Sequence, residues 1–257
     1  MSGLAYREEG DGDRVALLVH GYPESSYMWR HLMPVLADAG WRAVAPDLAG
    51  FGDSPPDGPG TWEAHVERLA AFHEQHGLGR VLLVTHDWGV LIGLRWACDN
   101  PGLVRGLVIS DGGFFADRRW HDLANVMRTP GEGEKLMAAL TRDALVAALP
   151  DLGDDAIDEY AKGFEGDERR RGHLELYRSG DFEKLEPYEG KLAALGVPAL
   201  IVWGAEDRFA GPAMAHRFHD ELPGSGLTVV DGAGHFVWEE APEATTRAVA
   251  GFLSRVP

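Results

Sequence analysis

The sequence predicts an α/β fold: a doubly wound, mostly parallel sheet with a helical cap insertion. Short apolar runs rich in Val, Ile and Leu alternate with longer amphipathic segments, as strands and helices do in such a sheet. The apolar runs are nearly continuous, which is typical of strands buried on both faces. The block between Phe114 and Lys191 interrupts this alternation, because it lacks such runs and is rich in Gly, Asp, Glu and Arg.

The individual elements follow from this alternation and from the positions of helix-breaking residues. Strands are expected at 15–19, 42–45, 81–85, 107–110, 199–203 and 227–230. Helices are expected at 62–76, 88–100 and 243–253. The second of these helices ends before Pro101 and the third begins after Pro242, because proline starts a helix well but cannot continue one.

The interrupting block is expected to fold as a helical cap. Its amphipathic segments predict helices at 136–149, 156–164 and 168–177. Apolar residues such as Leu174 and Phe182 make a disordered linker a poor interpretation. We therefore expect a core domain formed by residues 1–113 and 195–257, and a cap formed by residues 114–194.

Composition narrows the partners and the compartment. The net charge of −17, from 41 acidic and 24 basic residues, disfavours nucleic acid, whose binding needs a basic surface, and anionic substrates. No apolar run is long enough to span a membrane, and the first residues lack the pattern of a signal peptide. Because Cys98 is the only cysteine, no intrachain disulfide can form. We expect a cytoplasmic monomer or homodimer.

The most informative motif is Val84-Thr85-His86-Asp87-Trp88-Gly89, which joins the strand expected at 81–85 to the helix expected at 88–100. A tight turn of this kind presents one side chain above the sheet, and in the common hydrolase version that side chain is a serine. Here it is Asp87, whose carboxylate would attack carbon and form an ester. An aspartate before a helix is also a frequent N-cap, and the local sequence leaves both interpretations open.

Other polar groups also follow predicted strands, so the fold would bring them to the same edge of the sheet as Asp87. His20-Gly21-Tyr22-Pro23 follows strand 15–19, and the backbone N–H groups of Tyr22 and Trp88 are placed to form an oxyanion hole. His235, in the glycine-flanked turn after strand 227–230, is placed to act as a general base.

An acid is needed to orient this histidine. Asp207 follows strand 199–203 and could accept a hydrogen bond from the imidazole of His235. Two other acids compete for this role: the neighbouring Glu206, and Asp111 after strand 107–110, which is a candidate second acid. The order of Asp87, Asp207 and His235 along the chain is that of the triad in α/β-hydrolases.

The chain resembles the α/β-hydrolase fold family over essentially its whole length. Within it, His86-Asp87-Trp88-Gly89 is similar to the branch that contains epoxide hydrolases and haloalkane dehalogenases. The resemblance implies that Asp87 is the nucleophile, that His235 activates the water that hydrolyses the ester, and that Asp207 orients the histidine. It also implies an oxyanion hole formed by the N–H groups of Tyr22 and Trp88.

Two features resemble epoxide hydrolases. One is the stretch His20-Gly21-Tyr22-Pro23-Glu24-Ser25, and the other is Tyr177 in the expected cap. The phenol of Tyr177 would protonate the departing alkoxide, although the packing of a helix would explain this residue equally well. That family usually has two cap tyrosines, and the candidate for the second, Tyr160, lies late in the cap.

Other features resemble dehalogenases. Residues 26–30 and 93–97 do so, and the indole of Trp88 holds the leaving halide in those enzymes. Dehalogenases need a second halide donor, however. Tyr22 stands where their asparagine would fall, and Trp120 does not clearly match their alternative tryptophan.

We therefore expect an epoxide hydrolase, with a haloalkane dehalogenase as the first alternative and a non-catalytic small-molecule binder as the second. The substrate is expected to be a small, largely apolar organic molecule, and no nucleic acid or membrane is expected as a partner. The sequence shows no cluster of metal ligands and no phosphate-binding loop, so we expect no cofactor and no metal.

Overall fold

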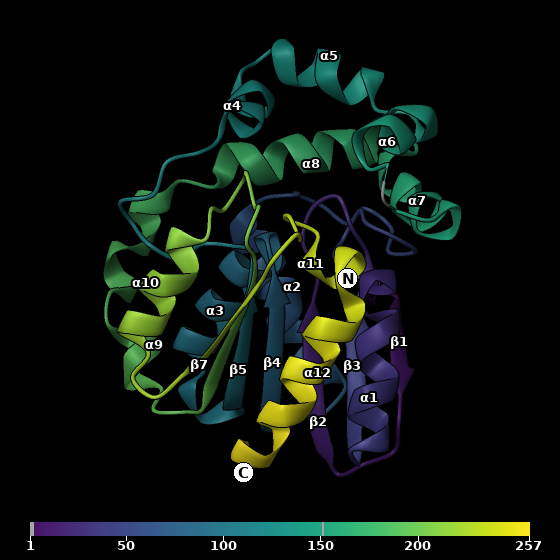
Figure 1. The fold of residues 1–257 in the computed structure, drawn as a ribbon. Coiled ribbons are helices and arrows are strands. Elements are labelled where there is room, and N and C mark those ends of the chain that lie inside the picture. Colours follow the sequence, from purple (N-terminus) through teal and green to yellow (C-terminus); the bar gives the residue numbers. More distant parts are fainter. Residues whose placement is uncertain (1–2, 151) are drawn as a thin grey trace.

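The computed structural model describes residues 3–150 and 152–257, which form a seven-stranded sheet flanked by helices (Figure 1). The strands are β1 (Tyr6–Glu9), β2 (Arg14–Val19), β3 (Trp41–Pro46), β4 (Val81–His86), β5 (Val104–Ser110), β6 (Ala199–Gly204) and β7 (Gly226–Val230). Their order across the sheet is β1-β3-β2-β4-β5-β6-β7. β1 pairs antiparallel with β3 and the other pairs are parallel, so the predicted sheet is confirmed.

The sequence analysis missed β1. This strand lies at the edge of the sheet and has the sequence Tyr-Arg-Glu-Glu, most of which is exposed to solvent. An edge strand that pairs on one side and stays mostly exposed needs no apolar run, so hydrophobicity alone does not reveal it.

Helices cover both faces of the sheet. They are α1 (Leu32–Asp38), α2 (Trp62–Gln75), α3 (Trp88–Asp99), α10 (Ala213–Glu221), α11 (Val237–Glu240) and α12 (Pro242–Phe252). One apolar cluster packs α2 and α3 against Leu17 and Leu83, and a second packs α1 and α12 against Leu18 and Leu82. Successive strand residues point to opposite faces, which is why each buried strand is apolar at almost every position.

A group of helices lies between β5 and β6 in the sequence. They are α4 (Asp122–Arg128), α5 (Glu132–Ala139), α6 (Arg142–Ala148), α7 (Asp154–Ala161), α8 (Asp167–Ser179) and α9 (Lys191–Ala194). Figure 1 shows α4 to α8 above the carboxyl ends of the parallel strands. The single helix expected at 136–149 is wrong: the structure has α5 and α6 there, because Thr141 caps a new helix by accepting from Ala144 N.

The chain has no helix in residues 3–150 and 152–257 that is long and apolar enough to span a bilayer.

Candidate active site

Asp87 occupies the sharp turn between β4 and α3 with a φ of 48°, a conformation that non-glycine residues seldom adopt. The turn is tight enough to need small neighbours. A Cβ at Gly89 would lie 2.1 Å from the carbonyl oxygen of Val19, and one at Gly21 would lie 2.4 Å from Cβ of Asp87. The Asp87 carboxylate does not cap α3; its Oδ1 accepts a hydrogen bond from Tyr22 N at 2.8 Å. The helix-cap interpretation is therefore wrong.

His235 bridges two carboxylates. Its Nδ1 lies 3.0 Å from Oδ2 of Asp207, and its Nε2 lies 3.4 Å from Oδ2 of Asp87. Asp207 is buried, and its Oδ1 accepts hydrogen bonds from the backbone of Phe209 and Ala210. With one oxygen fixed by the loop and the other on the imidazole, Asp207 sets the orientation and the tautomer of His235.

The charges in this group are strongly coupled. Burial alone would raise the pKa of Asp87, but His235, His86 and the N–H of Tyr22 outweigh it and lower the pKa to about 2. Burial alone would lower the pKa of His235, but Asp207 and Asp87 outweigh it and raise that pKa well above its usual value. The resting site therefore holds an imidazolium between two carboxylates.

Neither rival acid has a hydrogen bond to His235 among the described residues. Glu206 is exposed to solvent. Asp111 is fully buried, but its Oδ1 accepts from Gly204 N at 2.9 Å and its Oδ2 lies 3.8 Å from Nδ1 of His86. Burial and the charge of Asp207 raise the pKa of Asp111 well above its usual value, which favours the protonated form of this acid.

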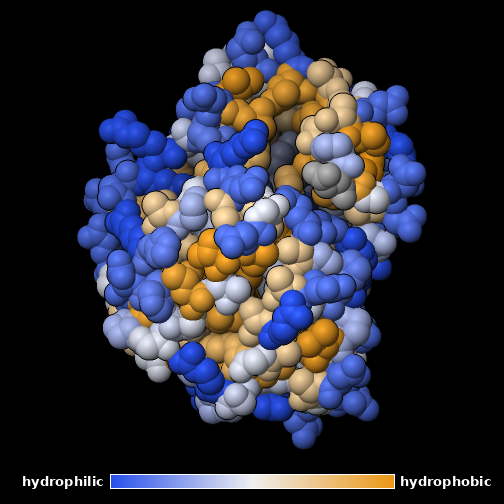
Figure 2. All heavy atoms as spheres, viewed as in Figure 1, coloured by the Kyte–Doolittle hydropathy of each residue, from blue (hydrophilic) through white to orange (hydrophobic). Residues whose placement is uncertain are grey.

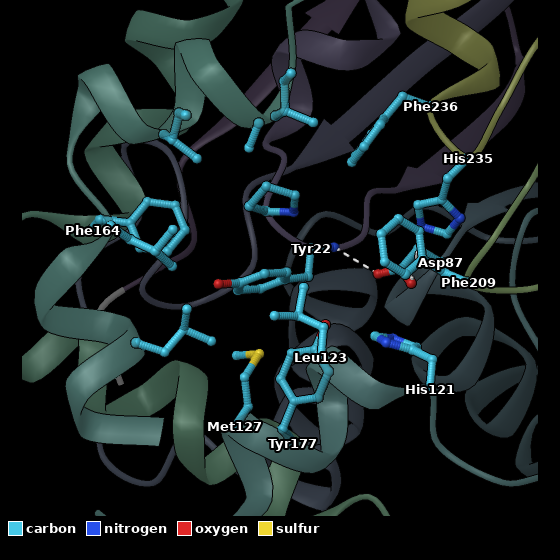
Figure 3. A pocket seen from close by; sticks show the side chains of 16 residues that line it. Tyr22, Asp87, His121, Leu123, Met127, Phe164, Tyr177, Phe209, His235 and Phe236 are labelled. Carbon is cyan, nitrogen blue, oxygen red and sulfur yellow. Dashed lines mark hydrogen bonds and ion pairs between the residues drawn. The ribbon is translucent and has the colours of Figure 1, made fainter. Parts of the chain in front are cut away.

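A cavity of about 180 Å³ opens onto Asp87 and His235. It is smaller than the pockets that enclose drug-sized ligands, so it suits a small molecule. Most of its lining is apolar and comes from the helices between β5 and β6, including Leu123, Met127 and Leu136. Figure 2 shows apolar side chains gathered around a hollow in this part of the surface, and Figure 3 shows the side chains that line the cavity.

Tyr177 on α8 and Trp88, which follows Asp87 in the chain, each carry a polar hydrogen. The Tyr177 ring, on α8, packs edge-on against Tyr22 and Trp88, at centroid distances of 5.2 and 5.3 Å. Burial, and then the charge of Asp87, raise the pKa of Tyr177 well above its usual value, so the phenol stays protonated. The indole N–H of Trp88 is buried, has no hydrogen-bond partner among the described residues, and lies close enough to the phenol to oppose this rise.

The other aromatic candidates are occupied or point elsewhere. The indole of Trp120 donates to Gly180 O at 2.7 Å, so its N–H is not free for a leaving group. The Tyr160 hydroxyl donates to Glu239, which removes it as a partner of Tyr177. The hydroxyl of Tyr22 is buried and directed away from Asp87, so this residue serves the site through its backbone (Figure 3).

One polar lining residue was missed by the sequence analysis. His121 precedes α4 and faces the cavity (Figure 3). Its position directly before an amphipathic segment could have indicated a helix cap, but nothing in the local sequence indicates that it lines a pocket.

The part of the chain that the structure describes contains no group of three or more His, Cys, Asp or Glu side chains arranged to hold a metal ion.

The sheet order, the elbow and the histidine between two carboxylates define a hydrolase of the α/β-hydrolase type. Residues 15–242 match the family described as alpha/beta hydrolase fold, and the chain belongs to that family. The aspartate at the elbow and the relatives described next place it in the Asp-nucleophile branch.

Several proteins are similar to this chain over almost its whole length. A haloalkane dehalogenase from Bradyrhizobium diazoefficiens is 32% identical, covering 99% of this chain and 92% of the relative. The structure of a haloalkane dehalogenase from Bradyrhizobium elkani has a TM-score of 0.83 at 30% identity, covering 98% and 94% of the two chains. The structure of an epoxide hydrolase from Vigna radiata has a TM-score of 0.82 at 25% identity, covering 97% and 93%.

Proposed function

We propose that this protein is a haloalkane dehalogenase that hydrolyses a carbon–halogen bond through an ester on Asp87. The observation that carries the proposal is the buried indole N–H of Trp88, which has no hydrogen-bond partner among the described residues. An unsatisfied buried donor is costly, and it becomes useful where negative charge develops in a reaction. The names of the more similar relatives support the same activity, and this reverses the preference for epoxides that the sequence suggested.

In the first step, a carboxylate oxygen of Asp87 attacks the substrate carbon. The new carbon–oxygen bond forms as the carbon–halogen bond breaks, and the halide leaves with the bonding electron pair. The pKa of about 2 keeps Asp87 ionised for this attack. The indole N–H of Trp88 and the protonated phenol of Tyr177 receive the halide, and Tyr177 thereby supplies the second donor that an asparagine gives in related enzymes.

The second step depends on the charge that the first removes. The ester of Asp87 is neutral, so one of the two carboxylates that raise the pKa of His235 is lost and the imidazole releases its proton. Neutral His235 then takes a proton from water, and the hydroxide attacks the carboxyl carbon of the ester. The N–H groups of Tyr22 and Trp88 stabilise the oxyanion. As it collapses, the departing alkoxide takes the proton from His235 and leaves as the alcohol, and the acid restored on Asp87 returns its own proton to His235.

We also propose that residues 114–194 form a cap on a core made of residues 1–113 and 195–257. The helices of this segment supply most of the apolar lining of the cavity. An apolar lining excludes water from the carboxylate during the first step, which strengthens its interactions with the substrate. The size of the cavity restricts the substrate to a small, largely apolar molecule.

Epoxide hydrolysis is the second candidate, and Tyr177 favours it. The protonated phenol beside Asp87 could give its proton to an alkoxide as an epoxide opens. Tyr177 would act without the usual second tyrosine, because the hydroxyl of Tyr160 is bonded to Glu239. A single proton donor serves an alkoxide less well than a pair, whereas a halide needs no proton.

A trapping experiment distinguishes these reactions. The His235→Gln variant should form the ester but fail to hydrolyse it, so intact mass spectrometry should show one added alkyl group after incubation with 1-bromobutane. Asp87→Asn in the same background is the matched control and should show no addition. An adduct from 1,2-epoxybutane alone would replace the proposal with epoxide hydrolysis. No adduct from either compound would reject the ester mechanism and leave a non-catalytic binder.

A further inference from the structure

The proposed reaction leaves one polar side chain of the cavity without a role. Asp87, His235, Tyr22 and Tyr177 all take part in it, and the rest of the lining is apolar apart from His121. This residue is half-buried and belongs to the segment before α4. A polar group in a largely apolar cavity usually fixes the orientation of a ligand.

The protonation state of His121 follows from its hydrogen bond. It is the N-cap of α4, and its Nδ1 lies 3.2 Å from the backbone N–H of Ala124, from which it accepts. Nδ1 must therefore carry a lone pair, and in the neutral ring the proton is on Nε2. Burial lowers the pKa of His121, with the charge of Asp87 acting against it, so the ring is neutral near pH 7.

The position of the ring sets what Nε2–H can reach. The His121 ring packs edge-on against Phe209 at 4.9 Å, and Phe209 packs in the same way against His235 at 5.0 Å. His121 is thus one aromatic ring away from the histidine of the triad, and Figure 3 shows it below Asp87 on the same wall. Because Nδ1 is held by the backbone of α4, Nε2 at the far end of the ring is the atom available to a ligand.

We propose that His121 selects substrates that carry a hydrogen-bond acceptor, such as an ether oxygen, a few bonds from the reacting carbon. The inference rests on the proposed function and adds a substrate class to it. An ether oxygen placed against Leu123, Met127 or Phe236 would lose its water without gaining a partner, which costs free energy. Next to Nε2–H of His121 that loss is compensated by a hydrogen bond.

A matched pair of variants separates this role from the capping of α4. Asparagine is among the best N-cap residues, so His121→Asn should keep the bond to Ala124 N while its shorter side chain no longer reaches the substrate. His121→Leu loses both functions. Thermal unfolding should therefore show a lower melting temperature for His121→Leu than for His121→Asn, and the Asn variant should stay close to wild type.

The substrates are matched as well. 1-Bromo-2-methoxyethane and 1-bromobutane have the same number of heavy atoms and differ by an oxygen in place of a methylene. The ratio of their kcat/KM values should fall about fivefold in His121→Asn relative to wild type, as for the loss of one neutral hydrogen bond. The change should appear in KM, because the bond is made equally in the ground and transition states. An unchanged ratio would overturn the inference.

A separate arm distinguishes failure of the inference from failure of the proposed function. If the wild type releases bromide from neither compound, the dehalogenase proposal has failed. The same comparison is then made with adducts of His235→Gln, using glycidyl methyl ether and 1,2-epoxypentane, which are again matched in size. A preference for the ether that disappears on adding His121→Asn supports the role of His121; equal rates in both backgrounds, or no adduct from either epoxide, reject it.

Discussion

Replacing Gly21 by alanine tests how the loop after β2 positions Asp87, the proposed nucleophile. In the structure a Cβ at this position would lie 2.4 Å from Cβ of Asp87 and 2.6 Å from its Oδ1. Non-bonded carbon atoms are most stable at about 3.5–4.0 Å, so relieving the overlap requires a movement of about 1 Å. The loop or the elbow must move, since the atoms that the new Cβ would overlap belong to Asp87 itself.

This displacement predicts how much activity and stability the Gly21→Ala variant loses. A misplacement of about 1 Å in an active site lowers the rate about 100-fold. In free energy this is about 2.7 kcal/mol of transition-state stabilisation. The overlap also destabilises the fold, by about 1–3 kcal/mol as for other overpacked sites. Activity and stability should therefore both fall, with the larger effect on activity.

Bromide release from 1-bromobutane measures the activity, and thermal unfolding shows that the variant is folded at the assay temperature. Gly102→Ala is the matched control, because an added Cβ there meets no heavy atom within 4 Å and the residue has no left-handed backbone. That variant should behave as the wild type. A Gly21→Ala enzyme within about threefold of wild-type kcat/KM would refute the argument that this contact positions Asp87.

Three further predictions follow from the site and its surroundings. Asp87→Asn removes one of the two charges that raise the pKa of His235, so an NMR titration of the ring should show a lower pKa; an equal or higher value would contradict the charge coupling. Trp88→Phe removes the indole N–H that has no partner among the described residues, so inhibition by bromide should weaken about tenfold. Trp120→Phe is the control and should leave inhibition unchanged, because the Trp120 N–H is bonded to the backbone. Equal effects of the two substitutions would reject the proposed halide site. Tyr160→Phe removes the hydrogen bond from the Tyr160 hydroxyl on α7 to the carboxylate of Glu239 on α11. The melting temperature should fall by about 3–6 °C while kcat stays unchanged. No change in melting temperature would show that the bond contributes little.

Much of the fold was predictable because the buried parallel strands leave a direct hydrophobic signal. β4, for example, is buried at every residue, and its expected range differs from the observed one by a single residue. Structure that does not depend on burial was harder to predict. β1 is a mostly exposed edge strand, and the break between α5 and α6 depends on one side-chain cap at Thr141.

The site was predictable where topology alone brings residues together. Asp87, Asp207 and His235 each follow a strand of the parallel sheet, and in the structure His235 lies between the two carboxylates, hydrogen-bonded to Asp207 and paired with Asp87. The proposed leaving-group site could not be predicted in this way. It depends on how α8 packs Tyr177 against Trp88, and on whether the N–H of Trp120 is already bonded, and neither is encoded in local sequence.

Local sequence also could not decide whether Asp111 or Asp207 is the acid that orients His235. β5 and β6 are parallel neighbours, so both acids reach the same edge of the sheet. What separates them is how each side chain is held. One oxygen of Asp111 accepts a hydrogen bond from Gly204 N at the end of β6, and burial and the charge of Asp207 raise its pKa, which favours the neutral form. One oxygen of Asp207 accepts from backbone donors, which leaves the other oxygen for His235. Burial alone would raise the pKa of Asp207, but other effects, chiefly its hydrogen bond with His235, lower it, so this carboxylate stays ionised. Only an ionised acid can stabilise the imidazolium.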